Sequence, residues 1–369
     1  MDKTLKHGLS PNSRKYSKTV FIGRFQPFQL AHLKTVEEAL EISDQVIIAI
    51  GSAKRPRTIK NPWTVEERQV LIEKSLEEHF SMEKGWTDYP HEIKARIKFI
   101  YIRDHMYNNT RWATEIYSKA VSAGATQCDK TCLIGCFKDD SSWYLKMFPQ
   151  WSFHEVKPIY HKSRMINATD IRTEIFEKEC IKEFLPLISK DVYESIEGWV
   201  KTSIAKDLKE EYTFLKNYKK QWESAPYAPT FVTADSVVIK SGHILLIKRK
   251  FNPGKGLWAL PGGFLNPQET VEKCALRELK EETGLKVSKK ILEANIKEVS
   301  KFDHPQRSLR GRTITFAHLI NLDEGPLPEI KAGDDASGAH WIPLADLASL
   351  EEQTFEDHMD IIQRLVSKY

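Results

Sequence analysis

Short apolar runs alternate with stretches of helical periodicity through the first half of the chain. Residues 20–23 and 46–50 are apolar on both faces, which is typical of strands that are covered on two sides. Between them, Leu33, Val36 and Leu40 recur at the spacing of one helix face. Apolar strands that alternate with amphipathic helices predict an α/β fold with a parallel, doubly wound sheet.

The same alternation continues to about residue 134. We expect two further helices and two further strands, at 65–80, 112–121, 97–102 and 131–134. Thr64 and Glu67 form a capping box that starts the first of these helices. Because ligands of doubly wound sheets bind at the carboxyl ends of the strands, we expect a site around Gly23 and Gly51.

The pattern changes in the middle of the chain. Residues 176–222 are helical and charged. The apolar residues on one face of this stretch are Ile204, Leu208, Tyr212 and Leu215. Pro226 and Pro229 cannot continue a helix, so we expect a domain junction there.

Strands dominate beyond the two prolines. Residues 231–239 and 244–249 are joined by Lys240-Ser241-Gly242-His243, which is a hairpin signal. Further strands over 313–320 and near Trp341, and a terminal helix from about Phe355, indicate an α+β domain. We therefore expect a first domain over 18–185, a helical linker region over 186–227 and a second domain over 228–369.

Composition narrows the class of protein. The chain has 369 residues, with 55 Lys and Arg against 51 Asp and Glu, so its net charge is only +4. This balance argues against nucleic acid or a membrane surface as a partner. No apolar run approaches the ~18 residues of a membrane span, and the first residues have no signal-like stretch, so we expect a cytoplasmic protein. The five cysteines are an odd number, which fits reduced thiols better than a disulfide framework.

The segment from Gly263 to Leu285 carries the strongest chemical signal. Asn266 is expected to cap a helix, Glu269 to close its capping box and Gly284 to end it. Glu278, Glu281 and Glu282 then share one helix face, where like charges repel unless something compensates them. A hard divalent cation such as Mg²⁺ would do so, and it could also activate water against a diphosphate. The alternative is an ordinary solvated, charge-rich helix face.

This segment resembles the Nudix box at each of its fixed positions. They are Gly263, Glu269, Arg277, Glu278, Leu279, Glu281, Glu282, Gly284 and Leu285. The resemblance implies an α+β Nudix domain in which Glu278, Glu281, Glu282 and the Gly263 carbonyl hold Mg²⁺, or Mn²⁺ in its place. It also implies that Glu269 and Arg277 belong to the catalytic machinery.

Two further features of this domain concern the substrate. Trp258 precedes the box. Its ring is expected either to stack on a base or to lie in the core, and the sequence favours neither role over the other. Arg307, Arg310 and Arg312 place three guanidinium groups beside a strand, where they suit a diphosphate or a ribose phosphate unless they form a solvated loop.

The first domain has a phosphate motif between its first strand and first helix. Gly23, Arg24 and Phe25 lead to a helix start, where free amides favour phosphate and His32 would face the same ligand. This element resembles the G-R-F-Q-P-x-H-x-G-H motif of the nicotinamide-mononucleotide adenylyltransferases, which implies a Rossmann-like nucleotidyltransferase domain. A second family signature falls on residues 166–172 and supplies Thr169 and Arg172. The resemblance also implies that Trp63, Asn109 and Trp112 lie near the nicotinamide and its ribose, although either tryptophan fits a core role equally well.

Four positions depart from that family pattern. Gln29 and Ala31 replace the first histidine and the glycine of H-x-G-H, and Asn167 and Ala168 stand where serines are usual. Gln29 can still donate to a phosphate but carries no charge. The domain is therefore either an active adenylyltransferase or one that binds nucleotides without turnover.

Together the two domains resemble the bifunctional nicotinamide-mononucleotide adenylyltransferase/Nudix hydrolases. That resemblance implies synthesis of NAD and pyrophosphate from ATP and nicotinamide mononucleotide, and Mg²⁺-dependent hydrolysis of ADP-ribose to AMP and ribose 5-phosphate. The rival hypothesis is a Nudix hydrolase whose first domain only binds or senses NAD-related nucleotides. A further alternative keeps the hydrolase but changes its substrate to NADH or another nucleoside diphosphate. Asp334, Asp335 and Glu351 are candidate general bases. The choice between nicotinamide and nicotinate, the coupling of the domains and any homo-oligomer are left open by the sequence.

Overall fold

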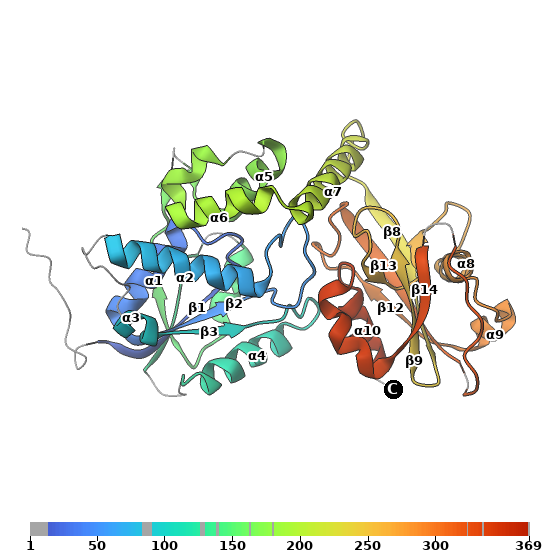
Figure 1. Cartoon of the computed structure of the whole chain (residues 1–369). Helices are drawn as coiled ribbons and strands as arrows, with labels where there is room; N and C mark the ends of the chain where they lie inside the picture. The colour runs from blue at the N-terminus through green and yellow to red at the C-terminus, as the bar shows by residue number, and fades with distance from the viewer. Residues whose placement is uncertain are drawn as a thin grey trace, which may run out of the picture. The chain divides into compact units, whose positions relative to one another are not determined.

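The computed structural model describes residues 14–82, 91–125, 130–137, 140–161, 164–178, 181–322, 324–333 and 336–367 (Figure 1). The chain divides into two compact units, one ending at Leu208 and the other starting at Lys209. This division falls inside a helix, α7 (Ser203–Lys220), and within the stretch that was expected to be a helical linker. Asp334, Asp335, Cys128 and Cys180 lie outside the described residues.

A five-stranded sheet forms the centre of the first unit. Its strands are β1 (Tyr16–Gly23), β2 (Ser43–Ile50), β3 (Ile97–Tyr101), β4 (Thr131–Gly135) and β5 (Ser152–Glu155), in the order β3-β2-β1-β4-β5. All pairings of this sheet are parallel, with Val20 opposite both Ile47 and Leu133. The predicted parallel, doubly wound sheet is thus confirmed.

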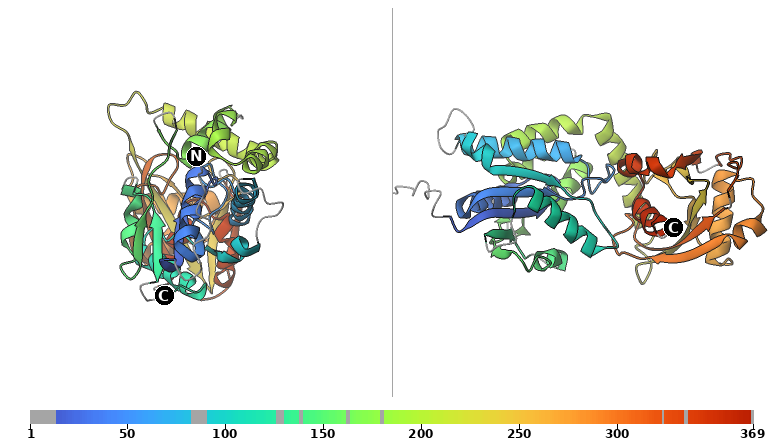
Figure 2. Two further views of the ribbon diagram at one scale, coloured as in Figure 1. Left: turned by 90° about the vertical axis from the view of Figure 1, so that its left-hand side faces the viewer. Right: turned by 90° about the horizontal axis from the view of Figure 1, so that it is seen from below.

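Helices cover both faces of this sheet (Figure 2). On one face, α1 (Leu30–Ile42) and α2 (Val65–Met82) bury residues such as Leu33, Val36 and Ile72 against Val46 and Ile48. On the other, α4 (Asn109–Ser122) and the 3₁₀ helix η2 (Asp140–Lys146) pack against Val20, Ile22 and Ile47. The short α3 (His91–Arg96) precedes β3. The predicted capping box of α2 is present, because Thr64 N donates to Glu67 Oε2 at 2.9 Å and Glu67 N to Thr64 Oγ1 at 3.3 Å.

Several short elements complete the first unit. They are β6 (Tyr160–His161), β7 (Arg164–Met165), α5 (Ala168–Lys178), the 3₁₀ helix η3 (Lys182–Leu187) and α6 (Lys190–Val200), which packs on α2. The helical stretch expected at 176–222 is therefore divided into separate helices, and Pro186 lies inside η3. Along α7, Leu208 and Leu215 are buried as one stripe, but Ile204 is exposed and Ala205 takes the buried position instead.

A seven-stranded mixed sheet forms the second unit. Its strands are β8 (Thr230–Lys240), β9 (His243–Arg249), β10 (Trp258–Ala259), β11 (Gly262–Phe264), β12 (Ile296–Phe302), β13 (Arg312–Asn321) and β14 (Ala336–Pro343). The long strands β8 and β13 run parallel, and β11 pairs antiparallel with β8. The predicted hairpin is confirmed: Lys240 pairs with His243, and Ser241 and Gly242 have φ values of 45° and 73°, as a tight two-residue turn requires.

The helices of the second unit are α8 (Val271–Thr283), α9 (Lys289–Ala294), the 3₁₀ helix η4 (Leu344–Gln353) and α10 (His358–Val366). α8 buries Cys274 and Ala275 against Ala234 of β8. It begins at Val271, four residues later than expected, so the assignment of Asn266 as its N-cap is wrong. Thr270 caps it instead, with Oγ1 accepting from Lys273 N at 3.3 Å. In the described part of the chain, none of the helices has the length and apolar character that crossing a membrane requires.

Candidate functional sites

A pocket of about 410 Å³ opens at the carboxyl end of the first sheet. Gly23 at the end of β1, Gly51 after β2 and Gly135 at the end of β4 all line it. The chain leaves β1 between β2 on one side and β4 on the other, which is the switch point where such sheets bind ligands. A Cβ on Gly23 would lie 2.7 Å from the Phe25 ring, so a side chain cannot be added there without moving that ring.

His32 lines this pocket from the first turn of α1. Its Nδ1 accepts a hydrogen bond from Gln29 N at 3.2 Å, and its ring lies edge-on to Phe25 with centroids 5.0 Å apart. Because Nδ1 is an acceptor, the neutral ring carries its proton on Nε2, where it can donate to a phosphate oxygen. The helix start and the exposed Arg24 add positive potential to the same pocket.

Aromatic side chains form another wall of the pocket. Trp112 lies 5.6 Å from Trp143 and 5.9 Å from Tyr144, measured between ring centroids. Burial raises the pKa of Tyr144 to about 12, so its hydroxyl stays protonated at neutral pH. Trp112 was predicted from the sequence but its two partners were not, because their approach depends on the packing of η2 beside α4.

A buried arginine joins the loops that shape this pocket. Arg68 is 1% exposed, and its guanidinium donates to the carbonyl oxygens of Arg24 at 2.8 Å, Gly51 at 2.6 Å, Ser52 at 3.2 Å and Thr64 at 3.1 Å. Burial lowers the pKa of Arg68 to about 10, which still leaves it charged at neutral pH. Arg68 of α2 thereby holds both the loop that follows β1 and the loop that follows β2.

Six other expected residues, all within the described part of the chain, do not line this pocket. Phe25, Gln29 and Trp63 are buried, and Trp63 packs on Trp199 at 5.1 Å. Asn109 and Thr169 are exposed on α4 and α5. Arg172 is buried and donates to Gln26 O at 2.6 Å and Thr169 Oγ1 at 3.1 Å. The structure therefore places Gly23, Arg24, His32 and Trp112 together, and Arg172 behind the loop that follows β1.

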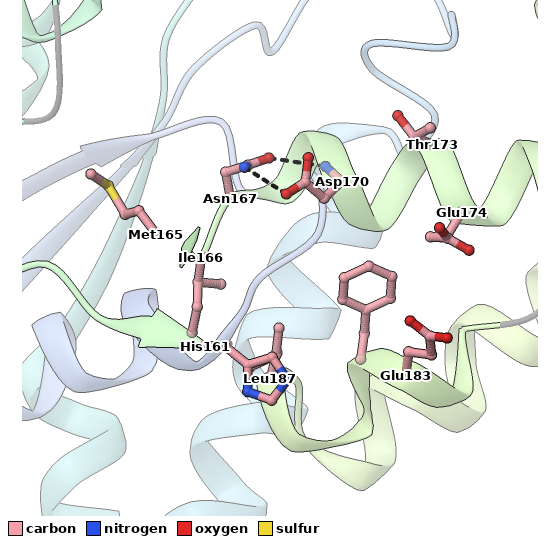
Figure 3. A pocket seen from close by; sticks show the side chains of 10 residues that line it. His161, Met165, Ile166, Asn167, Asp170, Thr173, Glu174, Glu183 and Leu187 are labelled. Atoms are coloured by element: carbon pink, nitrogen blue, oxygen red, sulfur yellow. Dashed lines mark hydrogen bonds between the residues drawn. The ribbon is translucent and has the colours of Figure 1, made fainter. Parts of the chain in front are cut away.

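The start of α5 explains one departure from the family pattern. Asn167 Oδ1 accepts from Asp170 N, and its Nδ2 donates to Asp170 Oδ2, both at 2.9 Å (Figure 3). Asparagine therefore caps this helix as a serine would. A second hollow of about 270 Å³ lies here, and its lining includes Asp170, Glu174 and Glu183, so it is acidic and unsuited to phosphate.

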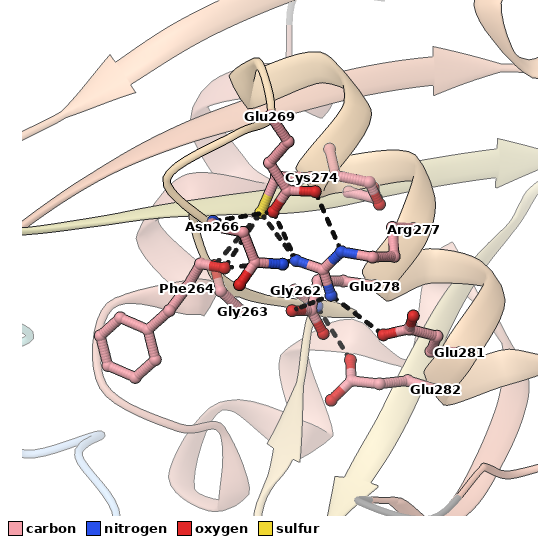
Figure 4. Close-up of polar contacts among 12 residues, drawn as sticks. Gly262, Gly263, Phe264, Asn266, Glu269, Cys274, Arg277, Glu278, Glu281 and Glu282 are labelled. Atoms are coloured by element: carbon pink, nitrogen blue, oxygen red, sulfur yellow. Dashed lines mark hydrogen bonds and ion pairs between the residues drawn. The ribbon is translucent and has the colours of Figure 1, made fainter.

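Arg277 is the centre of the polar cluster of the second unit (Figure 4). It donates to both oxygens of Glu269, at 3.0 and 2.6 Å, to Glu278 at 2.7 Å and to Glu281 at 2.9 Å. The hydrogen bonds from Arg277 lower the pKa of Glu269 to about 2. Arg277 thus ties the loop before α8 to the carboxylates on the helix.

Glu282 stands apart from that ion-pair network. Its buried carboxylate accepts from Gly262 N at 2.9 Å. Burial, with smaller contributions from Glu278 and Asp235, raises the pKa of Glu282 to about 8, and the Gly262 hydrogen bond only partly opposes this. Burial also raises the pKa of Glu278. At neutral pH Glu282 is therefore mostly protonated when no cation is nearby, and a bound cation would favour the charged form of both carboxylates.

The donor set fits a hard divalent cation, although the carboxylates are not arranged as a ready-made cage. Within the described residues, no group of three or more His, Cys, Asp or Glu side chains is positioned to hold a metal ion. Glu278 and Glu281 are instead occupied by Arg277. Gly263 leaves the Glu278 carboxylate room that any Cβ would fill. A cation beside Gly263 would take carboxylate oxygens, which are the ligands that Mg²⁺ and Mn²⁺ prefer.

The remaining expected residues of this unit have varied surroundings. Trp258 is buried, with Lys248 Nζ 4.9 Å from its ring centroid. Arg307 is buried in a two-bond ion pair with Asp357, at 2.9 Å for each bond. Arg312 donates to Asp303 O at 2.6 Å. Arg310 lies over the rings of Phe264 and Phe355, at 5.0 and 5.9 Å. The three arginines therefore do not form one phosphate clamp.

Comparisons with known proteins agree with the division of the chain into two units. A family model described as cytidylyltransferase-like matches residues 20–212, and the model of the NUDIX domain matches residues 230–365. A nicotinamide/nicotinic acid mononucleotide adenylyltransferase of Acinetobacter baylyi is 37% identical over 54% of this chain and 94% of its own length. An ADP-ribose pyrophosphatase of Methanocaldococcus jannaschii is 40% identical over 36% of this chain and 75% of its own length.

Similarity to a solved structure also extends over nearly the whole chain. That structure is a bifunctional NMN adenylyltransferase/ADP-ribose pyrophosphatase from Francisella tularensis, crystallised with AMP and a manganese ion. It is 34% identical, covers 96% of this chain and 99% of its own, and superposes with a TM-score of 0.84. The chain therefore belongs to the cytidylyltransferase-like family through its first unit and to the NUDIX family through its second.

Proposed function

We propose that this chain is a bifunctional enzyme of NAD metabolism. Its first unit transfers an adenylyl group from ATP to nicotinamide mononucleotide, giving NAD and pyrophosphate. Its second unit hydrolyses ADP-ribose to AMP and ribose 5-phosphate. The polar cluster around Arg277, with a buried Glu282 on the same helix, supports this proposal most directly, because it gathers hard oxygen donors and includes a carboxyl group whose charged form a cation would favour.

In the second unit, the chain's own residues orient the carboxylates. Arg277 holds Glu269 to the helix, and Gly262 N–H fixes one oxygen of Glu282. Glu278, Glu281, Glu282 and the Gly263 carbonyl would hold a divalent cation, Mg²⁺ or Mn²⁺. When bound, the cation would polarise the diphosphate and make water a better nucleophile.

In the first unit, catalysis requires positioning and charge stabilisation rather than a covalent intermediate. The mononucleotide phosphate attacks the α-phosphorus of ATP in line, and pyrophosphate leaves. His32 Nε2–H and Arg24 stabilise charge on the phosphates at the helix start, while Trp112 offers a ring to the nicotinamide. Arg172 acts on the loop after β1 through Gln26 O rather than as a residue of the pocket wall.

A direct assay tests both activities. The purified chain is incubated with Mg²⁺, ATP and nicotinamide mononucleotide, and separately with Mg²⁺ and ADP-ribose, and the products are separated by chromatography. We expect NAD in the first mixture and AMP in the second. His32→Ala should abolish most of the first activity and Glu282→Gln most of the second, each without loss of the other. If either variant keeps the wild-type rate, the role of that residue is refuted.

A second function for the first unit is favoured by one observation. Gln29 is buried and does not line the pocket, so the histidine that it replaces in the family motif has no substitute at that position. A unit that binds NAD-related nucleotides without turnover would then regulate a partner or the hydrolase. Binding of nicotinamide mononucleotide and ATP by calorimetry, without release of pyrophosphate, would support this alternative.

A further inference from the structure

A pocket of about 380 Å³ is bounded by α8, α9 and the loop that joins them, and we call it the back pocket. From α8 it is lined by Lys273, Leu276 and Lys280, whose spacing of three and four positions places them on one side of a helix. From α9 it is lined by Lys289 and Leu292. Its volume lies within the range of pockets that bind small molecules.

The back pocket is distinct from the candidate metal site. Glu278 and Glu282 are each two positions from Lys280, and residues two apart in a helix point to nearly opposite sides. Although both glutamates are among the described residues, neither lines the back pocket. Glu269 and Arg277 do line it, and Arg277 also donates to Glu278. The back pocket therefore meets the candidate metal site only through the ion pair that orients the carboxylates.

Apolar side chains of the core form part of the lining. They are Leu276, Leu279, Leu285 and Leu292, which are each at most 5% exposed and belong to one core cluster of the second unit. An apolar group that enters the back pocket leaves water and contacts these leucines, which favours its binding. The back pocket thus accepts the alkyl or aryl part of a ligand.

The charge of the lining is positive. Four cationic side chains and one carboxylate line the back pocket. The Arg277 guanidinium is already bound by carboxylates, and Lys289 pairs with Glu293 at 3.4 Å. Within the described part of the chain, neither Lys273 nor Lys280 forms an ion pair. These two ammonium groups favour an anionic head group beside the apolar part of the ligand.

We propose that the back pocket binds an amphipathic anion, which acts as an effector of the hydrolase unit. The alkyl or aryl body lies against the leucines, and a phosphate or carboxylate head lies at Lys273 and Lys280. The occupant contacts Glu269 and Arg277, so it disturbs the alignment of the carboxylates on the other side of α8 and slows hydrolysis. The binding site does not depend on the proposed hydrolase function, whereas the effect on turnover rests on it.

Displacement of anilinonaphthalene sulfonate, a fluorescent amphipathic anion, tests binding without turnover. In the full-length chain, octyl phosphate and octanoate should each displace it. Octanol lacks the charge and inorganic phosphate lacks the apolar body, so each should be at least about tenfold weaker than octyl phosphate. If inorganic phosphate displaces the probe as well as octyl phosphate does, the leucines have no part in binding and the proposal is wrong.

Substitutions of Lys280 locate the site. Lys280→Glu places a like charge beside the head group and should raise the dissociation constant of octyl phosphate about tenfold or more. Lys280→Met removes the charge but keeps an apolar contact, so it should weaken octyl phosphate and leave octanol within about twofold. Lys290→Glu makes the same charge change at an exposed residue of α9 that does not line the back pocket, and is the matched control. Displacement that is equal in wild type and Lys280→Glu would reject the site.

Inhibition kinetics test the effector role. Without octyl phosphate, Lys280→Glu should hydrolyse ADP-ribose within about twofold of wild type, because Lys280 faces away from the carboxylates. Saturating octyl phosphate should lower the kcat of wild type about tenfold at unchanged KM, as loss of alignment does, and Lys280→Glu should resist it. A rise in KM alone would place the anion at the diphosphate site and overturn the proposal.

Two further results separate the alternatives. Co-sedimentation of wild type with vesicles of anionic phospholipid, lost in Lys280→Glu, would assign these lysines to a membrane surface and overturn the proposal of a soluble effector. If wild type does not hydrolyse ADP-ribose, the effector role fails together with the hydrolase. Displacement by octyl phosphate that is weakened in Lys280→Glu but not in Lys290→Glu would still support the binding site.

Discussion

Arg277 holds Glu269 through two hydrogen bonds, at 3.0 and 2.6 Å, although eight positions separate the two residues in the chain. The pair joins the loop before α8 to the second turn of the helix. The same guanidinium also reaches Glu278 and Glu281, so the fork of Arg277 sets the geometry of three carboxylates. A lysine has a single ammonium and cannot reproduce this fork.

We therefore expect Arg277→Lys to lower kcat/KM for ADP-ribose by about 10- to 100-fold, as expected when catalytic groups lose their alignment. Glu269→Gln should cause a similar loss. Because the two residues act through one contact, the double variant should lose little more than either single variant. Lys273→Ala, on the exposed side of the same helix, is the control. Additive losses in the double variant would show that Glu269 and Arg277 act separately.

Arg68 gives a prediction that is confined to the first unit. Its guanidinium donates to four carbonyl oxygens, including those of Arg24 and Gly51 on the two pocket loops. Arg68→Lys keeps the charge but cannot span these oxygens, so at least one buried carbonyl loses its donor, at a cost of about 1–3 kcal/mol. We expect adenylyl transfer to fall about tenfold or more, with the KM for ATP raised.

The second unit supplies the internal control for that variant. ADP-ribose hydrolysis by Arg68→Lys should stay within about twofold of wild type, because the substitution lies in the other compact unit. Equal losses in both activities would mean that the variant unfolds the whole chain. Unchanged adenylyl transfer would mean that the loops after β1 and β2 hold their geometry without Arg68.

The sequence predicted those features that depend on local pattern. Buried strands 46–50 and 131–134 follow from runs of apolar residues, and the αL conformation of Gly284 at the end of α8, with φ of 54°, follows from the box itself. β12 escaped prediction because its residues alternate between half-buried and exposed and include Lys and Glu, as an edge strand tolerates. The pairing of β12 with β13 depends on the tertiary fold, which the local sequence does not show.

The surroundings of the site residues were harder to predict, because they too depend on tertiary packing. Trp63 and Trp112 have the same side chain, yet one is buried against Trp199 and the other lines the pocket. Arg68 and Arg307 are both buried. Arg68 donates to main-chain carbonyl oxygens, whereas Arg307 pairs with the carboxylate of Asp357. Sequence pattern gives the type of side chain and its element, whereas the packing of distant elements decides whether it meets ligand or protein.

Glu115 gives a prediction about acid stability. His105 Nε2 lies 2.7 Å from one of its oxygens and Lys119 Nζ lies 2.6 Å from the other. Burial alone would raise the pKa of Glu115, but these hydrogen bonds outweigh burial and lower it to about 2. A lowered pKa in the folded state stabilises the fold above the unfolded value of about 4.3, and this contribution is lost as the pH falls towards 2.

Glu115→Gln should therefore reduce the free energy of unfolding of the first unit by about 1–3 kcal/mol at pH 7 and by less near pH 3. Denaturant unfolding followed by tryptophan fluorescence measures this at both pH values. Glu194→Gln removes an exposed ion pair with Lys190, 3.7 Å long, and should have little effect at either pH. If Glu115→Gln loses as much unfolding free energy near pH 3 as at pH 7, the role assigned to these hydrogen bonds is contradicted.

Gly263 gives a steric prediction for the second unit. A Cβ at this position would overlap the carboxylate of Glu278, so Gly263→Ala must displace either β11 or that carboxylate. We expect hydrolysis of ADP-ribose to fall about 100-fold, as a displacement near 1 Å causes at a catalytic centre, while adenylyl transfer is preserved. Gly198→Ala is the matched control, because its added Cβ meets nothing within 4 Å and alanine favours the helix. Normal hydrolysis by Gly263→Ala would place the reacting diphosphate away from Glu278, and the carboxylates of α8 would then have a structural role.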